Sequence, residues 1–173
     1  MTTTITNATL TVTITEAVTL NGYDQGSSNV LSLPNIDEVV KRIVTVSTTE
    51  TGLFSFAANV SSQVAADSGG VRQASYIAGH FDHDTARYIR ITNKDDTNHA
   101  TLVFRGESGA EFAVMLDAGN SFIYCCDTTD GAGVVNTMDA HSAAQSHTLE
   151  ALRDVTAQAN AADVDLEVFV AAV

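Results

Sequence analysis

The residues best suited to chemistry lie in the segment His80-Phe-Asp-His-Asp84. Two histidines three positions apart, with two aspartates beside them, offer the imidazole and carboxylate ligands that zinc and manganese accept. On a strand, however, residues three positions apart point to opposite faces, and the sequence supplies no identifiable third ligand. A cupin-type barrel would provide His-x-His with a downstream Glu, which is absent here. We therefore expect this segment to be the polar end of a strand that runs into a loop. We expect no cofactor, and His80 and His83 are the only candidate metal ligands.

Other acidic residues recur in short groups along the chain. Asp127-Thr-Thr-Asp-Gly131 comes nearest to a calcium loop but does not meet the twelve-residue pattern of such a loop. Asp163, Asp165 and Glu167 alternate with apolar residues, so they occupy the polar face of a strand. A solvated acidic face explains these groups better than a cation site does.

The usual nucleophiles and phosphate-binding loops are not arranged for catalysis. No Gly-x-Ser-x-Gly occurs, and Gly131-Ala-Gly133 lacks both the third glycine and the helix that a phosphate loop needs. Cys125 and Cys126 are adjacent, so on a strand they face opposite ways, and a bond between them would be strained. They are typical of free thiols in a protein made in a reducing cytosol. We expect no catalytic residue and no enzymatic activity.

The elements that would position any site follow a period of two, which indicates strands. Thr9–Thr15 alternates threonine with Leu, Val and Ile, as a half-buried strand does. Turn residues such as Lys94-Asp-Asp-Thr-Asn98 separate further strands at a spacing of roughly ten residues, which is typical of a sandwich or jelly roll. The further strands are expected at 41–49, 53–57, 73–81, 87–93, 99–105, 111–116 and 121–126.

Loops are expected where small and polar residues gather. Gly22–Ser28 is one loop, and Pro34 marks the end of another, with a possible helical turn at Ile36–Val40. Residues 61–70 form a surface loop, and residues 128–146 form a long loop or excursion.

The last 25 residues leave two arrangements open. Leu149, Leu152 and Val155 fall at a helical spacing of three, whereas the alternation from Val164 to Val170 is that of a strand. The segment is therefore either a terminal β-hairpin, which we favour, or a helix followed by a strand.

Together these patterns predict an all-β fold. We expect residues 1–173 to form a single-domain antiparallel β-sandwich, jelly-roll-like, with residues 1–15 as an extended N-terminal strand or arm. Fully extended, such an arm would span about 50 Å and could add a strand to a neighbouring subunit.

Charge and hydropathy exclude several classes of function. The formal net charge is −13, and the only lysines are Lys41 and Lys94. Nucleic-acid binding needs clusters of Lys and Arg, so no nucleic-acid partner is expected. The N-terminus lacks the basic and apolar regions of a secretory signal, and no apolar run approaches the roughly 20 residues that span a bilayer. We expect no membrane partner.

Two segments carry a resemblance to a known class of proteins. Arg87-Tyr-Ile-Arg-Ile-Thr-Asn-Lys-Asp-Asp-Thr-Asn98 and Val114-Met-Leu-Asp-Ala-Gly-Asn-Ser-Phe-Ile123 resemble small virion structural proteins of tailed, notably marine, bacteriophages, and Asp165–Ala171 looks like their last strand. The resemblance implies a capsid decoration or cement protein made in the host cytoplasm and located on the outer capsid surface. Its partners would be the major capsid protein and copies of itself, for example as a homotrimer. The class carries no catalytic residues.

Two other functions remain open. A tail protein or a receptor- or glycan-binding β-module would need an exposed aromatic cluster, for which Tyr23, Tyr76 and Phe81 are the candidates. A small β-barrel enzyme would need a metal at His80 and His83, which metal analysis of the protein and of a variant with alanine at both positions would test.

Overall fold

The described part of the chain is built from strands joined by turns and loops. The computed structural model describes residues 8–56, 80–81, 85–106, 110–125, 134–135 and 150–173, and no helix occurs among them. Its strands are β1 (Ala8–Glu16), β2 (Thr19–Leu20), β3 (Tyr23–Asp24), β4 (Ser27–Ile36), β5 (Glu38–Val46), β6 (Thr51–Phe56), β7 (His80–Phe81), β8 (Ala86–Asn93), β9 (Ala100–Gly106), β10 (Glu111–Leu116), β11 (Ser121–Cys125), β12 (Val134–Val135), β13 (Glu150–Ala159) and β14 (Val164–Ala172).

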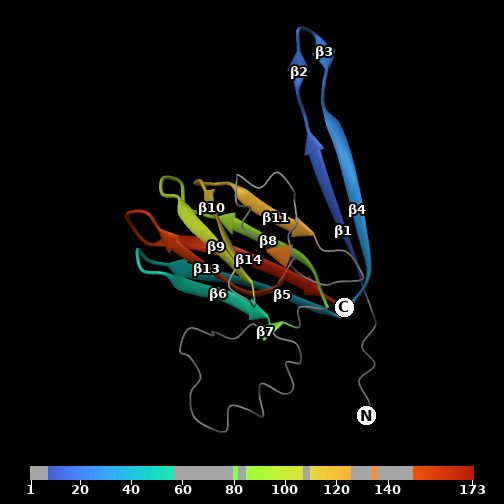
Figure 1. The fold of residues 1–173 in the computed structure, drawn as a ribbon. Coiled ribbons are helices and arrows are strands. Elements are labelled where there is room, and N and C mark those ends of the chain that lie inside the picture. The colour runs from blue at the N-terminus through green and yellow to red at the C-terminus, as the bar shows by residue number, and fades with distance from the viewer. Residues whose placement is uncertain (1–7, 57–79, 82–84, 107–109, 126–133, 136–149) are drawn as a thin grey trace, which may run out of the picture.

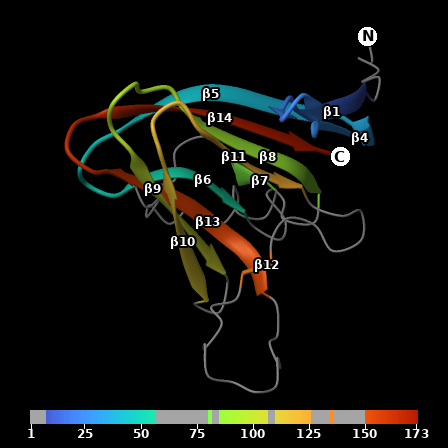
Figure 2. The same cartoon turned by 90° about the horizontal axis from the view of Figure 1, so that it is seen from above.

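Two sheets lie face to face and form the body of the molecule (Figures 1 and 2). The six-stranded sheet has the order β10-β9-β13-β6-β7, with β12 beside β13, and the four-stranded sheet has the order β11-β8-β14-β5. All pairings in these sheets are antiparallel except β6 with β7. The all-β prediction is confirmed, and the two opposed sheets are consistent with the predicted sandwich.

The core lies between the two sheets and follows from the alternation in the sequence. On β14, Val164, Leu166, Val168 and Val170 are buried, while the acidic residues between them face outward. Aromatic rings fill the space toward β10 and β11, where the rings of Phe104 and Phe112 stack 4.7 Å apart. Each fully buried large apolar side chain contributes on the order of 1.5–3 kcal/mol to folding, so these alternating positions supply most of the driving force.

Four connections cross between the sheets at one end of the sandwich, at the left of Figure 1: β5–β6, β8–β9, β10–β11 and β13–β14. Backbone hydrogen bonds join these connections, for example Asn93 N–H to Asn120 O and Lys94 N–H to Asp165 O, both at 2.9 Å. We call this the crossover end. Because each of these connections changes sheets, strands that are consecutive in the chain face each other across the core there.

An N-terminal hairpin, residues 8–36, forms a separate two-stranded sheet of β1 and β4 with the short pair β2–β3 at its tip. We call it the arm. Its tip turns at Asn21-Gly22, whose φ angles of 52° and 81° suit the left-handed conformation that this dipeptide adopts readily. Figure 1 shows the arm projecting from the sandwich with its tip clear of both sheets.

The extended N-terminal strand expected within residues 1–15 is confirmed as β1, which pairs with β4 in a hairpin, and residues 1–7 lie outside the described residues. The structure corrects two other predictions at the N-terminal end. The loop at Gly22–Ser28 is limited to the turns around β3, since Ser27 already begins β4. The helical turn at Ile36–Val40 is wrong, because Ile36 ends β4 and Glu38 begins β5.

Pro34 does not end a loop but lies within β4. The register between β1 and β4 shifts beside it, between Ala8 and Leu10, and Asn35 has a φ of 62°. A strand accommodates proline at such an irregularity or at a free edge, where a missing N–H breaks no ladder hydrogen bond.

The terminal segment consists of strands β13 and β14, so the alternative of a helix followed by a strand is wrong. The two strands do not pair as a hairpin either, because β13 pairs with β6 and β9 whereas β14 pairs with β5 and β8. Of the strand expected at 73–81, the structure describes His80–Phe81 as β7, and of the loop expected at 128–146 it describes Val134–Val135 as β12, a short strand. The loop at 61–70 lies outside the described residues.

Candidate functional site

The structure describes only one of the two candidate metal ligands. His80 lies at the start of β7, whereas His83 is outside the described residues, so their pairing stays a hypothesis. Within the described ranges, no group of three or more His, Cys, Asp or Glu side chains could hold a metal ion. Cys125, at the end of β11, is an exposed free thiol, and Cys126 lies outside the described residues.

The aromatic candidates for glycan binding do not form a cluster either. Tyr23 is 73% exposed at the tip of the arm, whereas Phe81 is buried in the core of the sandwich. Tyr76 lies outside the described residues. The two described rings therefore cannot share a binding face.

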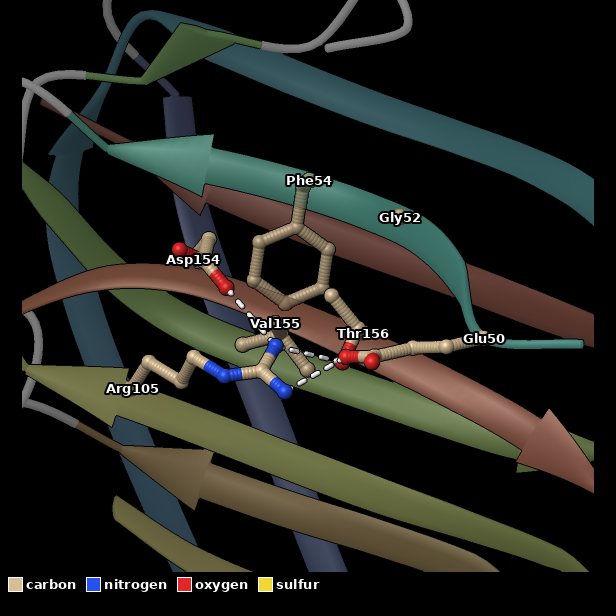
Figure 3. Close-up of a pocket in the computed structure, with 7 residues that line it drawn as sticks. All are labelled: Glu50, Gly52, Phe54, Arg105, Asp154, Val155 and Thr156. Carbon is tan, nitrogen blue, oxygen red and sulfur yellow. Dashed lines mark hydrogen bonds and ion pairs between the residues drawn. The ribbon is translucent and has the colours of Figure 1, made fainter. Parts of the chain in front are cut away.

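A charged cluster occupies a cavity of about 290 Å³ on the six-stranded sheet (Figure 3). Arg105 on β9 lies directly opposite Asp154 on β13, and its guanidinium reaches Asp154 at 3.4 Å and Glu50 at 2.5 Å. The same guanidinium donates to the Thr156 hydroxyl at 2.9 Å and contacts Glu111 at 3.4 Å. All three guanidinium nitrogens of Arg105 are thus engaged by neighbouring side chains.

The electrostatics of this cluster are those of a structural ion-pair network. The Thr156 hydroxyl and the Arg105 guanidinium both donate to Glu50, which lowers the pKa of that carboxyl below its ordinary value. Asp154, although buried, also accepts from Arg153 at 2.7 Å. A general acid would need a raised pKa, so the shift at Glu50 runs in the direction opposite to that role. The arrangement joins β9 and β13 to the β5–β6 connection.

A second concave region lies between the arm and the outer face of the four-stranded sheet. This groove encloses about 460 Å³, with one wall formed by the arm (Leu10, Thr11, Val12, Thr13, Ile14) and the other by the sheet (Tyr88, Arg90, Ser121, Ile123, Phe169). On the sheet wall, Tyr88 and Phe169 contact each other edge to face at 5.8 Å, and the Arg90 guanidinium lies 5.8 Å from the centre of the Phe169 ring. The lining of the groove therefore combines apolar side chains with hydroxyl groups and one cation, Arg90.

Ion pairs hold the charged side chains of this outer face in place. Glu167 on β14 accepts from Lys41 at 3.1 Å and from Arg90 at 2.7 Å. Hydrogen bonding by Lys41, and the charge of Lys41 and Arg90, lower the pKa of the Glu167 carboxyl. The outer face thus carries a satisfied charged row beside its apolar residues.

The base of the arm is anchored on this same face by a second apolar cluster. Leu33 and Ile36 of β4 are buried against Tyr88 and Ala171, with Leu10 and Val12 of β1 packed around them. Toward the tip the cover is progressively lost. The exposed fraction rises from 37% at Leu31 and 44% at Ile14 to 50% at Val18, 61% at Leu20 and 73% at Tyr23.

The pairing of β1 with β4 in a hairpin and the groove beside it are the features that the sequence predictions missed. The alternation of Thr9–Thr15 predicted a half-buried strand but not the strand that pairs with it. The dipeptide Asn21-Gly22 is the signal that could have found the turn, since Asn-Gly between strand-like segments is the strongest short-range mark of a hairpin.

Comparisons with known proteins add no relative. No protein-family model, no curated protein and no solved structure matches this chain. The described residues include no helix of the length and apolar character needed to cross a membrane.

Proposed function

We propose that this chain is a non-enzymatic structural protein of a tailed-bacteriophage virion, a decoration or cement subunit on the outer capsid surface. In this role it stabilises the shell through contacts with the major capsid protein and with copies of itself. The jelly-roll arrangement of the sandwich and a homotrimeric state belong to the same proposal.

One observation carries this function: the arm presents apolar side chains to solvent on a projecting element. Of the exposed large hydrophobic residues in the described ranges, six lie on the arm: Ile14 and Leu31 share one face, Val30 lies on the opposite face, and Val18, Leu20 and Tyr23 lie toward the tip. Apolar side chains that gather in solvent on the first face and at the tip are typical of a protein contact. Among the described strands, β1 and β4 pair only with each other, so the ribbon has two edges that an assembly would cover.

Charge supports the outer surface as the location. With a net charge of −13, the chain would be repelled by packaged DNA. The cations at Lys41, Arg90, Arg105 and Arg153 are engaged in ion pairs within the chain. Among the described acidic residues, Asp24, Asp37, Glu38 and Asp96 are exposed to solvent.

The test is mass spectrometry of density-banded virus particles that encode this chain, with its copy number measured against that of the major shell protein. We expect a copy number comparable to that of the shell protein. A few copies per particle would place the chain in the tail, and its absence from washed particles would overturn the proposal.

A further inference from the structure

The apolar face of the arm extends farther than the surface that covers it. Paired residues of an antiparallel ribbon share a face, so Leu10 with Leu33, Val12 with Leu31, and Ile14 lie together on one side. This side faces the four-stranded sheet at the base, where Leu33 is only 7% exposed, and is uncovered from Leu31 and Ile14 onward. In Figure 1 the arm passes the right-hand ends of β14, β8 and β11 and continues beyond β11.

The outer face of the four-stranded sheet holds a second uncovered apolar surface at its opposite edge. Val39 and Ile43 on β5 are 53% and 62% exposed. They pair with Ala171 and Glu167 of β14, so they share the outer face on which the arm is anchored. Lys41 lies between them on that face, 58% exposed, and pairs with Phe169 in the strand register. We call Val39, Lys41 and Ile43 the acceptor surface.

The two edges of this sheet are suited to each other. Among the described strands, β11 pairs with β8 alone and β5 pairs with β14 alone, so β11 and β5 are the two free edges of the sheet. Every pairing between them is antiparallel, which makes β11 and β5 run in opposite directions. A second copy placed beside the first in the same orientation would therefore set its β5 antiparallel to the first copy's β11, which continues the sheet pattern.

In that placement the arm of the first copy lies over the acceptor surface of the second. Ile14 and Leu20 are six residues apart, or about 20 Å along a strand, whereas neighbouring strands are about 4.8 Å apart. The uncovered part of the arm is thus long enough to cross β11 and cover β5 of the next copy. The only charged residues on the arm are Glu16 and Asp24, and Lys41 of the acceptor surface is already paired with Glu167 of its own copy, so the contact is mainly apolar.

We propose that copies of this chain associate head to tail, with the arm of one copy lying across Val39, Lys41 and Ile43 on β5 of the next. The inference rests on the proposed structural role and deepens it by naming a second copy as the partner of the arm. Each copy uses two different surfaces, so the contact is heterologous and generates a closed ring or an open chain according to the rotation between copies.

The test uses two variants, each of which removes one half of the contact. The arm variant carries Ile14→Asp and Leu31→Asp, and the acceptor variant carries Val39→Asp and Ile43→Asp. We expect the wild-type chain to be oligomeric by sedimentation equilibrium and each variant alone to be monomeric. An equimolar mixture of the two should form a 1:1 heterodimer, because the mixture contains one intact arm and one intact acceptor surface.

Two controls match the exposure of the substituted residues. Val30→Asp changes a residue of the arm that is 65% exposed on the opposite face, where it pairs with Thr13. Met115→Asp changes a residue that is 59% exposed on β10 of the other sheet. Both should keep the wild-type mass, and circular dichroism should show that all variants remain folded.

Three results would overturn the inference: a monomeric wild-type chain, an acceptor variant that still associates on its own, or a mixture that forms no heterodimer. The second result would indicate contact between arms instead. These results are distinguishable from a failure of the proposed function. If the heterodimer forms but particles lack the chain, only the virion role fails; if particles contain a chain that is monomeric in solution, only the head-to-tail contact fails.

Discussion

The side chain of Asn93 is buried at the crossover end, with 1% of the residue exposed, and both its amide nitrogen and its oxygen form hydrogen bonds. Its amide nitrogen donates to the carbonyls of Asn98 at 2.9 Å and Leu116 at 3.1 Å, and its oxygen accepts from the Asp95 N–H at 2.9 Å. One side chain thereby fixes the end of β8, its turn and the end of β10. A buried amide with all its partners adds specificity to a core, whereas one without partners is costly.

Replacement of Asn93 should therefore destabilise the whole sandwich. Asn93→Ala removes one buried and two part-buried hydrogen bonds, and we expect a loss of about 2–4 kcal/mol in the free energy of unfolding. Urea denaturation followed by circular dichroism measures this loss. Asn120→Ala, an exposed substitution in the neighbouring turn, is the control and should change stability by less than about 0.5 kcal/mol. Equal effects from the two substitutions would contradict the role of Asn93.

Lowering the pH should decrease the free energy of unfolding, because it protonates the carboxylates of Glu50 and Glu167. The pKa values of both carboxyls lie below their ordinary value of 4.5 in the folded chain, because hydroxyl or cationic partners bind the ionised forms. A depressed folded pKa gives stability that is complete above the unfolded pKa and is lost as pH falls through the folded pKa. We expect the urea concentration at the unfolding midpoint to decrease as the pH is lowered below about 4.5. Glu50→Gln and Glu167→Gln together should flatten this decline, and an unchanged decline in the double variant would assign it to other carboxyls.

At the level of elements, the sequence predicted where most strands lie but not how they pair. The alternation on β14 identifies its buried face, and the turn residues near Asn98 and Asn120 mark strand ends. A short connection such as Asn160–Asp163, however, is compatible with a hairpin or with a crossing between sheets. The alternation of apolar residues indicates which face of a strand is buried, but it does not indicate which strand lies beside it. That is why β13 and β14 were expected to pair with each other.

The candidate sites were harder to foresee for the same reason. Glu50, Arg105 and Asp154 come from three strand regions that only the sheet pairing brings together. No spacing in the sequence marks such a cluster. The apolar residues of the arm were visible as an alternation, but whether a face is covered depends on the elements around it, as the contrast between Leu33 and Ile14 shows.

Because the arm is anchored to the sandwich as a separate element, Leu33→Ala should destabilise the arm without destabilising the sandwich to the same extent. Leu33 is buried against the outer face of the four-stranded sheet rather than in the central core. We expect this variant to release the arm, so that limited proteolysis within residues 8–36 becomes faster, while the unfolding free energy of the sandwich falls by less than about 1 kcal/mol.

Leu166→Ala is the matched control, since Leu166 is fully buried in the central core. It should cost about 2–5 kcal/mol in global stability, the range for Leu→Ala in a packed core. A global loss of this size for Leu33→Ala as well would mean that the arm and the sandwich unfold as one unit.

At the scale of the whole molecule, the two ends of the sandwich differ in how strongly they are held. The crossover end is joined by hydrogen bonds between its connections and by the buried side chain of Asn93. The opposite end carries the arm, whose two strands pair with no other described strand and contact the body mainly at Leu33 and Ile36. An isolated two-stranded ribbon is marginally stable in water, so the outer part of the arm depends on whatever surface it meets.

Hydrogen exchange should resolve this difference and link it to association. At low protein concentration, we expect the amides of residues 12–16 and 27–31 to exchange at least about tenfold faster than those of β8 and β14, because local opening of the ribbon does not require the sandwich to unfold. At high concentration, protection should increase in the arm and in β5 together, since a head-to-tail contact covers both. Protection that increases in the arm alone would indicate contact between arms, and exchange that is independent of concentration would show that the arm makes no contact with other copies. The measurement therefore follows both halves of the proposed contact in the unmodified chain.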